Sequence, residues 1–308
     1  MRGISSPLLF LLLLAQPAVA SGAAQALAMP DYARAFHRGD YAGAMALAAE
    51  RLKAQPGDVQ ARIVLARVEA ARGRFQEAYT GFRKALDLDP RSADALYYLG
   101  ITAGVLAQAE YERLLAMAPG SARAHQLLGQ SHQAQGRTAE AEAELKAALE
   151  AGPPTAEVLT ALGDIARRSR LDFAEARTYY ARAIELAPGS YEALYGVGVC
   201  DSYAGEHAKA IESFRRALHI APNSAPARLA LGISLLQTGL AAQAVEELQA
   251  AAKLEPRMRQ AYYQLGRAYQ ALGRAQEAES AFARARELIQ EEREGVLDIV
   301  APGANPPP

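Results

Sequence analysis

Apolar and small residues recur along the chain in blocks of about 34 residues, close to the length of a helical hairpin. Each block contains an early Leu-Gly or Val-Gly pair, then a turn glycine and an alanine, and it ends at a proline. The block-ending prolines are Pro56, Pro90, Pro119, Pro153, Pro188, Pro222 and Pro256, spaced by 34, 29, 34, 35, 34 and 34 residues. Self-similarity at a fixed period predicts a repeat architecture in which each block is one helix pair.

Small residues within each block predict how the two helices pack. A paired glycine lets the second helix cross the first closely, and an alanine of the second helix fills the facing position. The glycines are Gly100, Gly129, Gly163, Gly198, Gly232 and Gly266, and the alanines are Ala78, Ala141, Ala176, Ala210, Ala244 and Ala278. One hairpin cannot bury its apolar face alone, so we expect neighbouring hairpins to stack and share a core.

A second set of glycines predicts the turns between the two helices. Glycine readily adopts the left-handed conformation that ends a helix, and the proline that follows the second helix turns the chain into the next unit. These turn glycines are Gly73, Gly136, Gly205, Gly239 and Gly273.

Together, these positions resemble the tetratricopeptide repeat, and the resemblance covers residues 25 to about 290. It implies an all-α, right-handed α-solenoid of about eight helix-turn-helix units within residues 21–294. The expected units are 25–58, 59–92, 93–121, 122–155, 156–190, 191–224, 225–258 and 259–292. Residues 295–308 are predicted to form a disordered Pro-rich tail.

Three units depart from the pattern. In the first, Pro30 should shorten the first helix, and the fifth has one extra residue within 168–173. The third is five residues short and lacks a Gly-x-aromatic turn in 101–106. We expect its first helix to end near Gly104, and the array to divide there into two blocks.

The amino terminus has the order of a secretory signal. Arg2 precedes the apolar run 8–15, and Ala18-Val19-Ala20 supplies a small-x-small site. We predict cleavage after Ala20 and a periplasmic or secreted protein. A retained anchor is the alternative, although the apolar run is shorter than the roughly 20 residues that span a bilayer.

Composition changes the picture in two ways. Ala, Leu, Glu, Arg and Gln dominate, and these residues favour helices. Without Arg2 the chain has 32 basic and 34 acidic side chains, so we expect no nucleic-acid partner and, after signal cleavage, no integral membrane segment. Cys200 is the only cysteine, which excludes an internal disulfide, and it is interpreted as a small buried residue rather than a reactive thiol.

No group of residues predicts catalysis, a cofactor or a metal. His125 and His132 share a helix but lie about 10.5 Å apart along its axis, too far to bind one metal together. The run 196–198 lacks the preceding strand and third glycine of a nucleotide loop. We therefore expect a protein that is not an enzyme.

Two charged runs have alternative interpretations. The basic cluster 167–170 is interpreted as a solvated turn beside Asp172 and Glu175, and docking of an acidic partner segment is the alternative. The run 291–294 is interpreted as a solvated helix face.

The resemblance implies that positions two, five, nine and twelve of each unit face a concave groove. Besides the groove residues selected below, these positions hold Gln60, Ile63, Arg67, Asp94, Arg123, Gln133, Glu157, Thr160, Glu192, Ser202, Gln260 and Gln270. No asparagine lies in any first helix, so the carboxylate clamp that the family uses for chaperone carboxyl termini is not expected.

The residues expected to contact a partner in this groove change in character along the chain. The middle is rich in amides and mixed in charge, and an apolar stripe follows that suits an inserted helix or extended segment. The twelve selected residues are Tyr97, Gln126, Gln130, Asp164, Arg167, Tyr195, Val199, Leu229, Ile233, Leu236, Tyr263 and Arg267. The alternative is that part of the stripe packs against its own neighbours.

These observations favour an exported scaffold or adaptor that binds protein or peptide segments, with envelope, secretion or polysaccharide-export assembly as its setting. The alternative is an accessory repeat subunit of an enzyme in a separate chain, such as a glycosyltransferase or protease complex. Self-association is a third possibility, which sizing across concentrations would distinguish.

Overall fold

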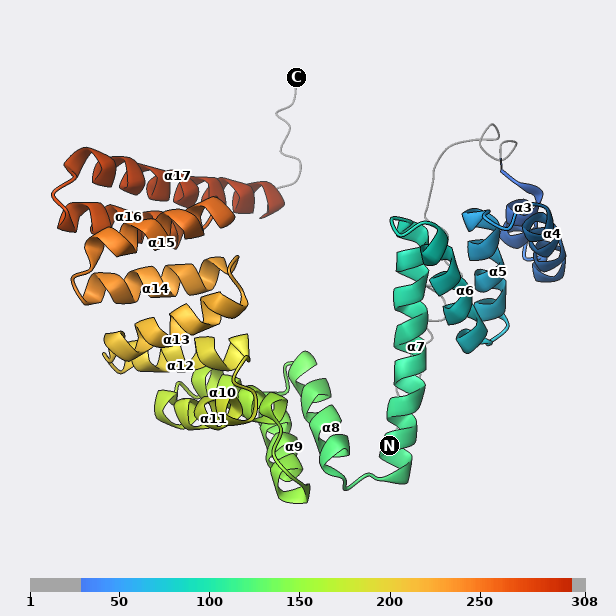
Figure 1. Cartoon of the computed structure of the whole chain (residues 1–308), viewed down its shortest axis with the longest axis horizontal. Helices are drawn as coiled ribbons and strands as arrows, with labels where there is room; N and C mark the ends of the chain where they lie inside the picture. Colours follow the sequence, from blue (N-terminus) through green and yellow to red (C-terminus); the bar gives the residue numbers. More distant parts are fainter. Residues whose placement is uncertain (1–28, 301–308) are drawn as a thin grey trace. The chain divides into compact units, whose positions relative to one another are not determined.

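The computed structural model describes the backbone of residues 29–300 and the side chains of residues 29–292. All secondary structure in this range is helical (Figure 1). The helices are α3 (Asp31–His37), α4 (Tyr41–Ala54), α5 (Val59–Ala71), α6 (Phe75–Leu88), α7 (Ala93–Met117), α8 (Ala122–Ala134), α9 (Thr138–Ala151), α10 (Ala156–Ser169), α11 (Phe173–Leu186), α12 (Tyr191–Tyr203), α13 (His207–Ile220), α14 (Ala225–Gln237), α15 (Ala241–Leu254), α16 (Arg259–Ala271) and α17 (Ala275–Val300). Except for α7, successive helices form hairpins, which confirms the expected all-α solenoid of helical repeats.

Most first helices begin at a side-chain cap two residues after the proline. The side chain of Ser190, for example, accepts a hydrogen bond from the backbone N–H of Ala193. Each such cap satisfies a backbone donor that the helix cannot and contributes about 1 kcal/mol. The residues that cap in this way are Asp58, Ser92, Ser121, Thr155, Ser190 and Ser224.

Five of the six paired glycines pack as the sequence predicts, and Gly100 does not, since a Cβ added there would meet nothing within 4 Å. A Cβ added at Gly198 would lie 2.6 Å from the Phe214 ring, and one added at Gly163 would lie 2.7 Å from the Tyr180 ring. The glycine thus makes room for the large side chain of the second helix. The six predicted alanines are buried, with no more than 2% of any residue exposed.

The five predicted turn glycines all have positive φ, and Gly39 joins them. The fifth hairpin differs, because Leu171 occupies this turn with φ 54° and is 68% exposed. The extra residue of this unit lengthens the turn, where the Asp172 N–H donates to the carbonyl of Ala166.

The described part of the chain forms two compact blocks, divided between Pro119 and Gly120. The amino-terminal block has core clusters around Phe36 and Phe82, and the carboxy-terminal block has core clusters around Leu145, Tyr180 and Phe214. The boundary lies after α7, at the end of the third unit, whereas the expected division lay near Gly104.

The expected end of a helix near Gly104 is wrong. Helix α7 continues unbroken through Met117, and Gly104 does not have a positive φ. Half of residues 101–108 are the strong helix formers Ala, Leu and Gln, the segment contains no proline, and a single internal glycine costs only about 1 kcal/mol. Five missing residues leave no turn, and the third unit is one long helix instead of a hairpin.

The first and last described helices, α3 and α17, lie next to the ends of the described range. Pro30 is the N-cap residue of the short helix α3, as expected. Helix α17 continues to Val300, beyond the predicted start of the tail at residue 295. The predicted signal, 1–20, and residues 301–308 lie outside the described residues.

Candidate binding surface on the first helices

The predicted groove residues of the carboxy-terminal block differ in exposure. Tyr263 is 51% exposed, whereas Leu229 is 9% exposed and belongs to the core cluster around Phe214. Gln130 and Arg267 are exposed, and Gln126, Asp164, Arg167, Tyr195, Val199, Ile233 and Leu236 are partly buried. Most of these side chains are therefore at least partly exposed to solvent, whereas Leu229 lies in the core.

Two predicted positions of the amino-terminal block are also core residues. Ile63 is 2% and Arg67 is 7% exposed. The Arg67 guanidinium lies 4.2 Å from the Phe36 ring centre and 4.5 Å from that of Tyr98, so it is held between two aromatic faces. Burial lowers its pKa from the usual value. Tyr97 is 50% exposed in this block.

A recess of about 380 Å³ crosses three first helices of the carboxy-terminal block. We call it the acidic recess, because three of its side chains are carboxylates. Gln133 comes from α8, most of the lining residues come from α10, and Glu192 comes from α12. Its lining residues are Gln133, Ala156, Glu157, Thr160, Ala161, Asp164, Ala187, Ser190 and Glu192.

Asp164 is held in place by contacts from both helices of its hairpin. Its Oδ1 accepts hydrogen bonds from the Tyr180 hydroxyl at 2.7 Å and from Arg167 at 2.9 Å. The Nε of Arg168 lies 3.7 Å from the same oxygen. These contacts orient the carboxylate and use one oxygen, so Asp164 can still accept hydrogen bonds from a ligand through Oδ2.

Glu157 and Glu192 lie in the first turns of α10 and α12. Both are exposed. The pKa of Glu157 is lowered mainly because its carboxylate accepts a hydrogen bond from the backbone N–H of Glu157. A hydrogen bond with the Thr155 side chain and the charge of Arg123 lower this pKa further. The recess therefore presents fixed negative charge to solvent, which favours a cationic group.

The predicted apolar stripe lies on α12 and α14. Tyr195 follows Glu192 by one turn, and its ring centre lies 5.9 Å from that of Tyr191 and 5.8 Å from that of Phe214. Tyr195, Val199, Ile233 and Leu236 all pack partly against the core cluster around Phe214. Because these side chains are partly covered by their own neighbours, the apolar stripe does not form an open groove.

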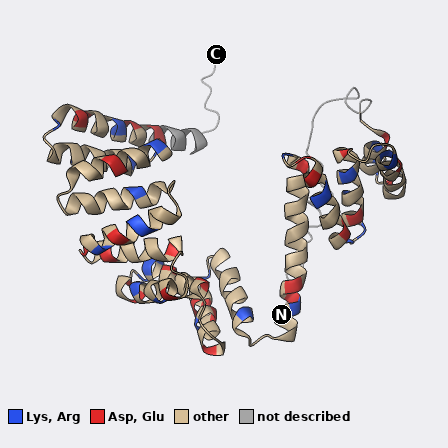
Figure 2. Ribbon diagram, in the orientation of Figure 1, with Lys and Arg blue, Asp and Glu red and all other residues tan. Residues whose placement is uncertain are grey.

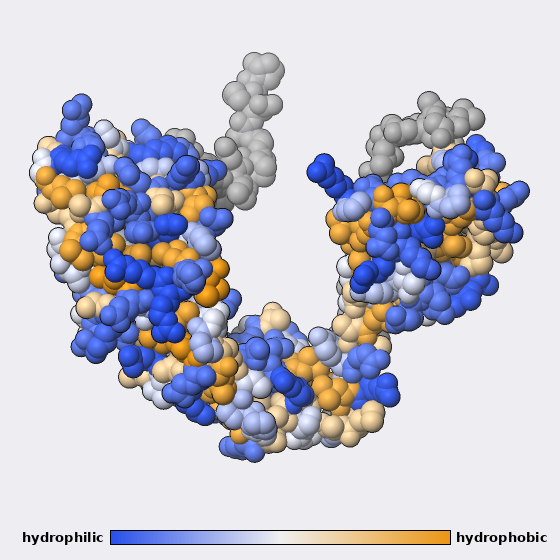
Figure 3. Space-filling view, in the orientation of Figure 1, coloured by the Kyte–Doolittle hydropathy of each residue, from blue (hydrophilic) through white to orange (hydrophobic). Residues whose placement is uncertain are grey.

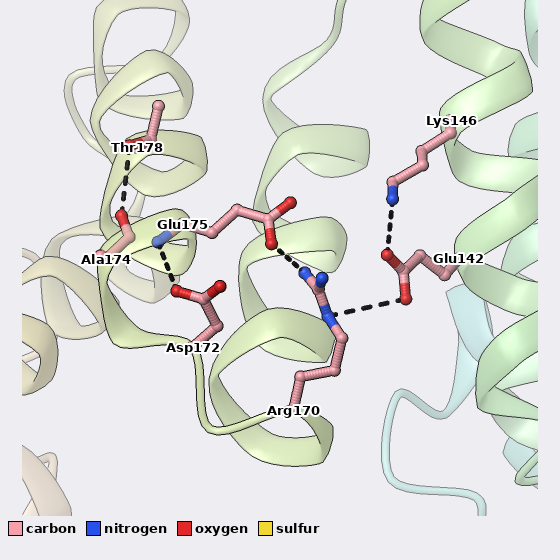
Figure 4. A network of polar contacts seen from close by, with 7 residues as sticks. All are labelled: Glu142, Lys146, Arg170, Asp172, Ala174, Glu175 and Thr178. Atoms are coloured by element: carbon pink, nitrogen blue, oxygen red, sulfur yellow. Dashed lines mark hydrogen bonds and ion pairs between the residues drawn. The ribbon is translucent and has the colours of Figure 1, made fainter.

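The basic cluster 167–170 is neutralised by carboxylates of the same block. Arg170 pairs with Glu175 and lies 3.8 Å from Glu142, which also bonds Lys146 at 2.7 Å (Figure 4). Arg167 pairs with Asp164. These pairs favour the interpretation of a solvated turn over docking of an acidic partner. Acidic and basic residues are also intermixed along α8–α17 (Figure 2).

The remaining sequence candidates provide no catalytic arrangement. Cys200 is 1% exposed, and burial raises its pKa to about 11, which keeps the thiol protonated near neutral pH. His125 contacts Glu144 at 2.7 Å. Within the described part of the chain, no cluster of His, Cys, Asp and Glu is placed to hold a metal. No helix among these residues is long and apolar enough to cross a bilayer.

Several structural residues were not identified from the sequence. Tyr180 is fully buried, and Asp201, 3% exposed, pairs with Arg177 of the preceding hairpin. Ala187 and Ser190 complete the recess from the loop before α12. The Phe/Tyr position of the repeat could have indicated Tyr180, but no sequence signal marked the loop residues.

Another recess, of about 480 Å³, lies between α5 and α6. Leu65, Ala66 and Gly81 line it together with Arg62 and Glu69. It contains none of the positions that the repeat pattern directs toward a partner, so the acidic recess remains the better candidate.

Sequence comparison identifies the same repeats. Three models described as tetratricopeptide repeat match residues 63–103 and 160–225, residues 105–165 and 203–256, and residues 260–291. No curated protein matches the chain.

Solved structures of a protein named MamA have a similar fold. One crystal structure of MamA is 25% identical with a TM-score of 0.50, covering 54% of this chain and 97% of MamA. Another is 24% identical with a TM-score of 0.51, covering 60% and 98%. MamA residues 41-end from Desulfovibrio magneticus RS-1 are 22% identical with a TM-score of 0.51, covering 55% and 96%.

Proposed function

The chain belongs to the tetratricopeptide repeat family, whose repeats form protein-interaction surfaces, and we propose that it binds a basic segment of a partner protein on the first helices of its carboxy-terminal block. The observation that carries this proposal is the acidic recess, in which Glu157, Asp164 and Glu192 from two adjacent first helices line one cavity. A lysine or arginine of the partner would enter the recess. Apolar residues of the same segment would contact Tyr195 and Val199.

The charges explain why a basic segment fits better than an acidic one. Arg167 is already bonded to Asp164 and to the Tyr180 hydroxyl, and these bonds outweigh burial and raise its pKa. The carboxylates of Glu157 and Glu192 are exposed and can pair with a partner. Charge complementarity of this kind sets specificity and the association rate.

Selection of random peptides displayed on phage against the purified protein tests this proposal. We expect enriched peptides to carry lysine or arginine beside an apolar residue, and their binding to weaken as salt rises. Glu157→Gln combined with Glu192→Gln should lower their affinity about tenfold, which corresponds to about 1.4 kcal/mol.

The matched control is Glu185→Gln combined with Glu212→Gln, which neutralises two exposed carboxylates on second helices. It should leave the affinity unchanged. Enrichment of acidic peptides, or equal loss in both double variants, would contradict the proposal.

We also propose that the protein works outside the cytoplasm, in an envelope, secretion or polysaccharide-export assembly. The support is the secretory-signal order of residues 1–20. Protein recovered from the periplasm or medium should begin near Ser21. Sequencing of its amino terminus checks this, and an intact Met1 would contradict the proposal.

A further inference from the structure

Helix α7 carries the sequence signatures of both arms of a hairpin. Leu99-Gly100 occupies the position of the first-helix pair. Ala107, Tyr111, Leu114 and Pro119 have the spacing of Ala78, Phe82, Ala85 and Pro90 in the preceding unit. One family match ends at residue 103 and another begins at residue 105. The two arms are therefore present but are joined without a turn.

The second arm exposes the face that a hairpin normally buries. In the preceding unit, Ala78, Phe82 and Ala85 are each 0% exposed. In α7, Tyr111 is 46% exposed, and Ala107 and Leu114 are only partly buried. Figure 3 shows patches of apolar surface between polar side chains along α7.

The glycine of the first arm shows the same unfilled contact. A Cβ added at Gly100 would meet nothing within 4 Å. At Gly129, Gly163, Gly198, Gly232 and Gly266 the added Cβ would lie within 2.6 to 2.7 Å of a large side chain of the second helix. Gly100 therefore lacks the ring or branched side chain that its position normally receives.

We propose that two copies of the chain pair their α7 helices antiparallel, so that the first arm of each packs against the second arm of the other. In regular hairpins the paired glycine meets the residue 16 positions later, as Gly198 meets Phe214. The equivalent side chain for Gly100 is Tyr111, which is only 11 positions later and on the same straight helix. A second copy supplies it without a turn.

Because the dimer has two-fold symmetry, a single alignment of the two helices forms both Gly100–Tyr111 contacts. When Gly100 lies beside Tyr111 of the other copy, Tyr111 lies beside the other Gly100. Gly104 then lies opposite Ala107 of the other copy, and these small residues permit a close crossing. Such an interface is isologous, and it closes at a dimer.

Charge is compatible with this pairing. No charged residue lies between Asp94 and Glu110, so the centre of the interface is neutral, and most of α7 is uncharged in Figure 2. The alignment places Asp94 about one turn from Arg113 of the other copy, where opposite charges attract. Antiparallel helices also align their dipoles favourably.

The size of the interface predicts its strength. Helix α7 has 25 residues, which corresponds to a strip about 37 Å long and about 10 Å wide. That is below the roughly 800 Å² per partner of a standard interface, so we expect a reversible dimer that forms at micromolar concentrations. Leu96, Tyr97 and Met117, each at least half exposed, add apolar area at its ends.

Sedimentation velocity of the full-length chain from about 1 to 200 μM covers the micromolar range expected for such an interface. We expect a monomer–dimer equilibrium. Tyr111→Ala should weaken the dimer at least tenfold. Gly100→Leu should abolish the dimer and leave the monomer equally or more stable, because its site is open in one chain and leucine favours the helix.

The matched control is Ala109→Leu, which adds a large side chain at an exposed position on the opposite side of α7. It should leave the dimer intact. A monomer at every concentration overturns the proposal, as does a dimer that Gly100→Leu and Tyr111→Ala leave unchanged. A lower melting temperature for Gly100→Leu would also overturn it, since the space beside Gly100 would then be filled within one chain.

Discussion

Replacing Tyr180 with alanine is expected to lower the free energy of unfolding of the carboxy-terminal block by about 3–5 kcal/mol, the range for a large buried aromatic. Its ring lies between two glycines, and added Cβ atoms at Gly163 and Gly196 would lie 2.7 and 2.6 Å from it. Because Gly163 belongs to its own hairpin and Gly196 to the next, removing the ring opens a cavity at the contact between two repeats. Urea unfolding followed by circular dichroism measures the loss.

Tyr180→Phe separates the ring from its hydroxyl. The hydroxyl donates to Asp164 and accepts from Arg167, so its removal should cost about 1–2 kcal/mol. Tyr203→Ala is the matched control, because Tyr203 is 71% exposed although it stacks on Phe173, and it should cost less than about 1 kcal/mol. If Tyr180→Ala costs no more than this control, Tyr180 does not join the two repeats.

Reversing the charge of the acidic recess is expected to have the largest effect on binding. Glu157→Lys combined with Glu192→Lys places two cations where the basic segment should bind. The affinity should fall at least 100-fold, or by about 2.7 kcal/mol. Isothermal titration calorimetry with a selected basic peptide measures this change.

Stability separates loss of the site from loss of the fold. Both glutamates lie in the first turn of a helix, where a lysine interacts unfavourably with the helix dipole at a cost of about 0.3–1 kcal/mol each. Circular dichroism should therefore remain helical with a modest loss of stability. Glu185→Lys combined with Glu212→Lys is the control and should retain binding. Equal loss of binding in both variants would point to general charge attraction without a defined site.

Local sequence rules predicted the regular hairpins well because each rule acts within one unit. The turn glycines, the buried alanines and the paired glycines all depend on neighbouring residues. In the third unit, which is five residues short, the local rules do not decide between a strained short turn and a continuous helix. Residues 101–108 contain no proline that would stop a helix, and α7 passes through Gly104.

The candidate site was harder to predict because one repeat position can face either the partner or the core. At position five, Leu229 and Ile63 are buried, whereas Tyr263 and Tyr97 are about half exposed. The recess also includes Ala187 and Ser190 from a loop, and a periodic pattern of helix positions cannot identify loop residues.

Carboxyl labelling with a carbodiimide and an amine, read by mass spectrometry, tests the proposed binding surface most directly. A selected basic peptide should protect Glu157 and Glu192 from labelling, because the peptide covers the recess that they line. Glu185 and Glu212, exposed on second helices, should react equally with and without peptide. Protection of Glu185 or Glu212 with free reaction of Glu157 and Glu192 would show that partners bind a different face of the repeats.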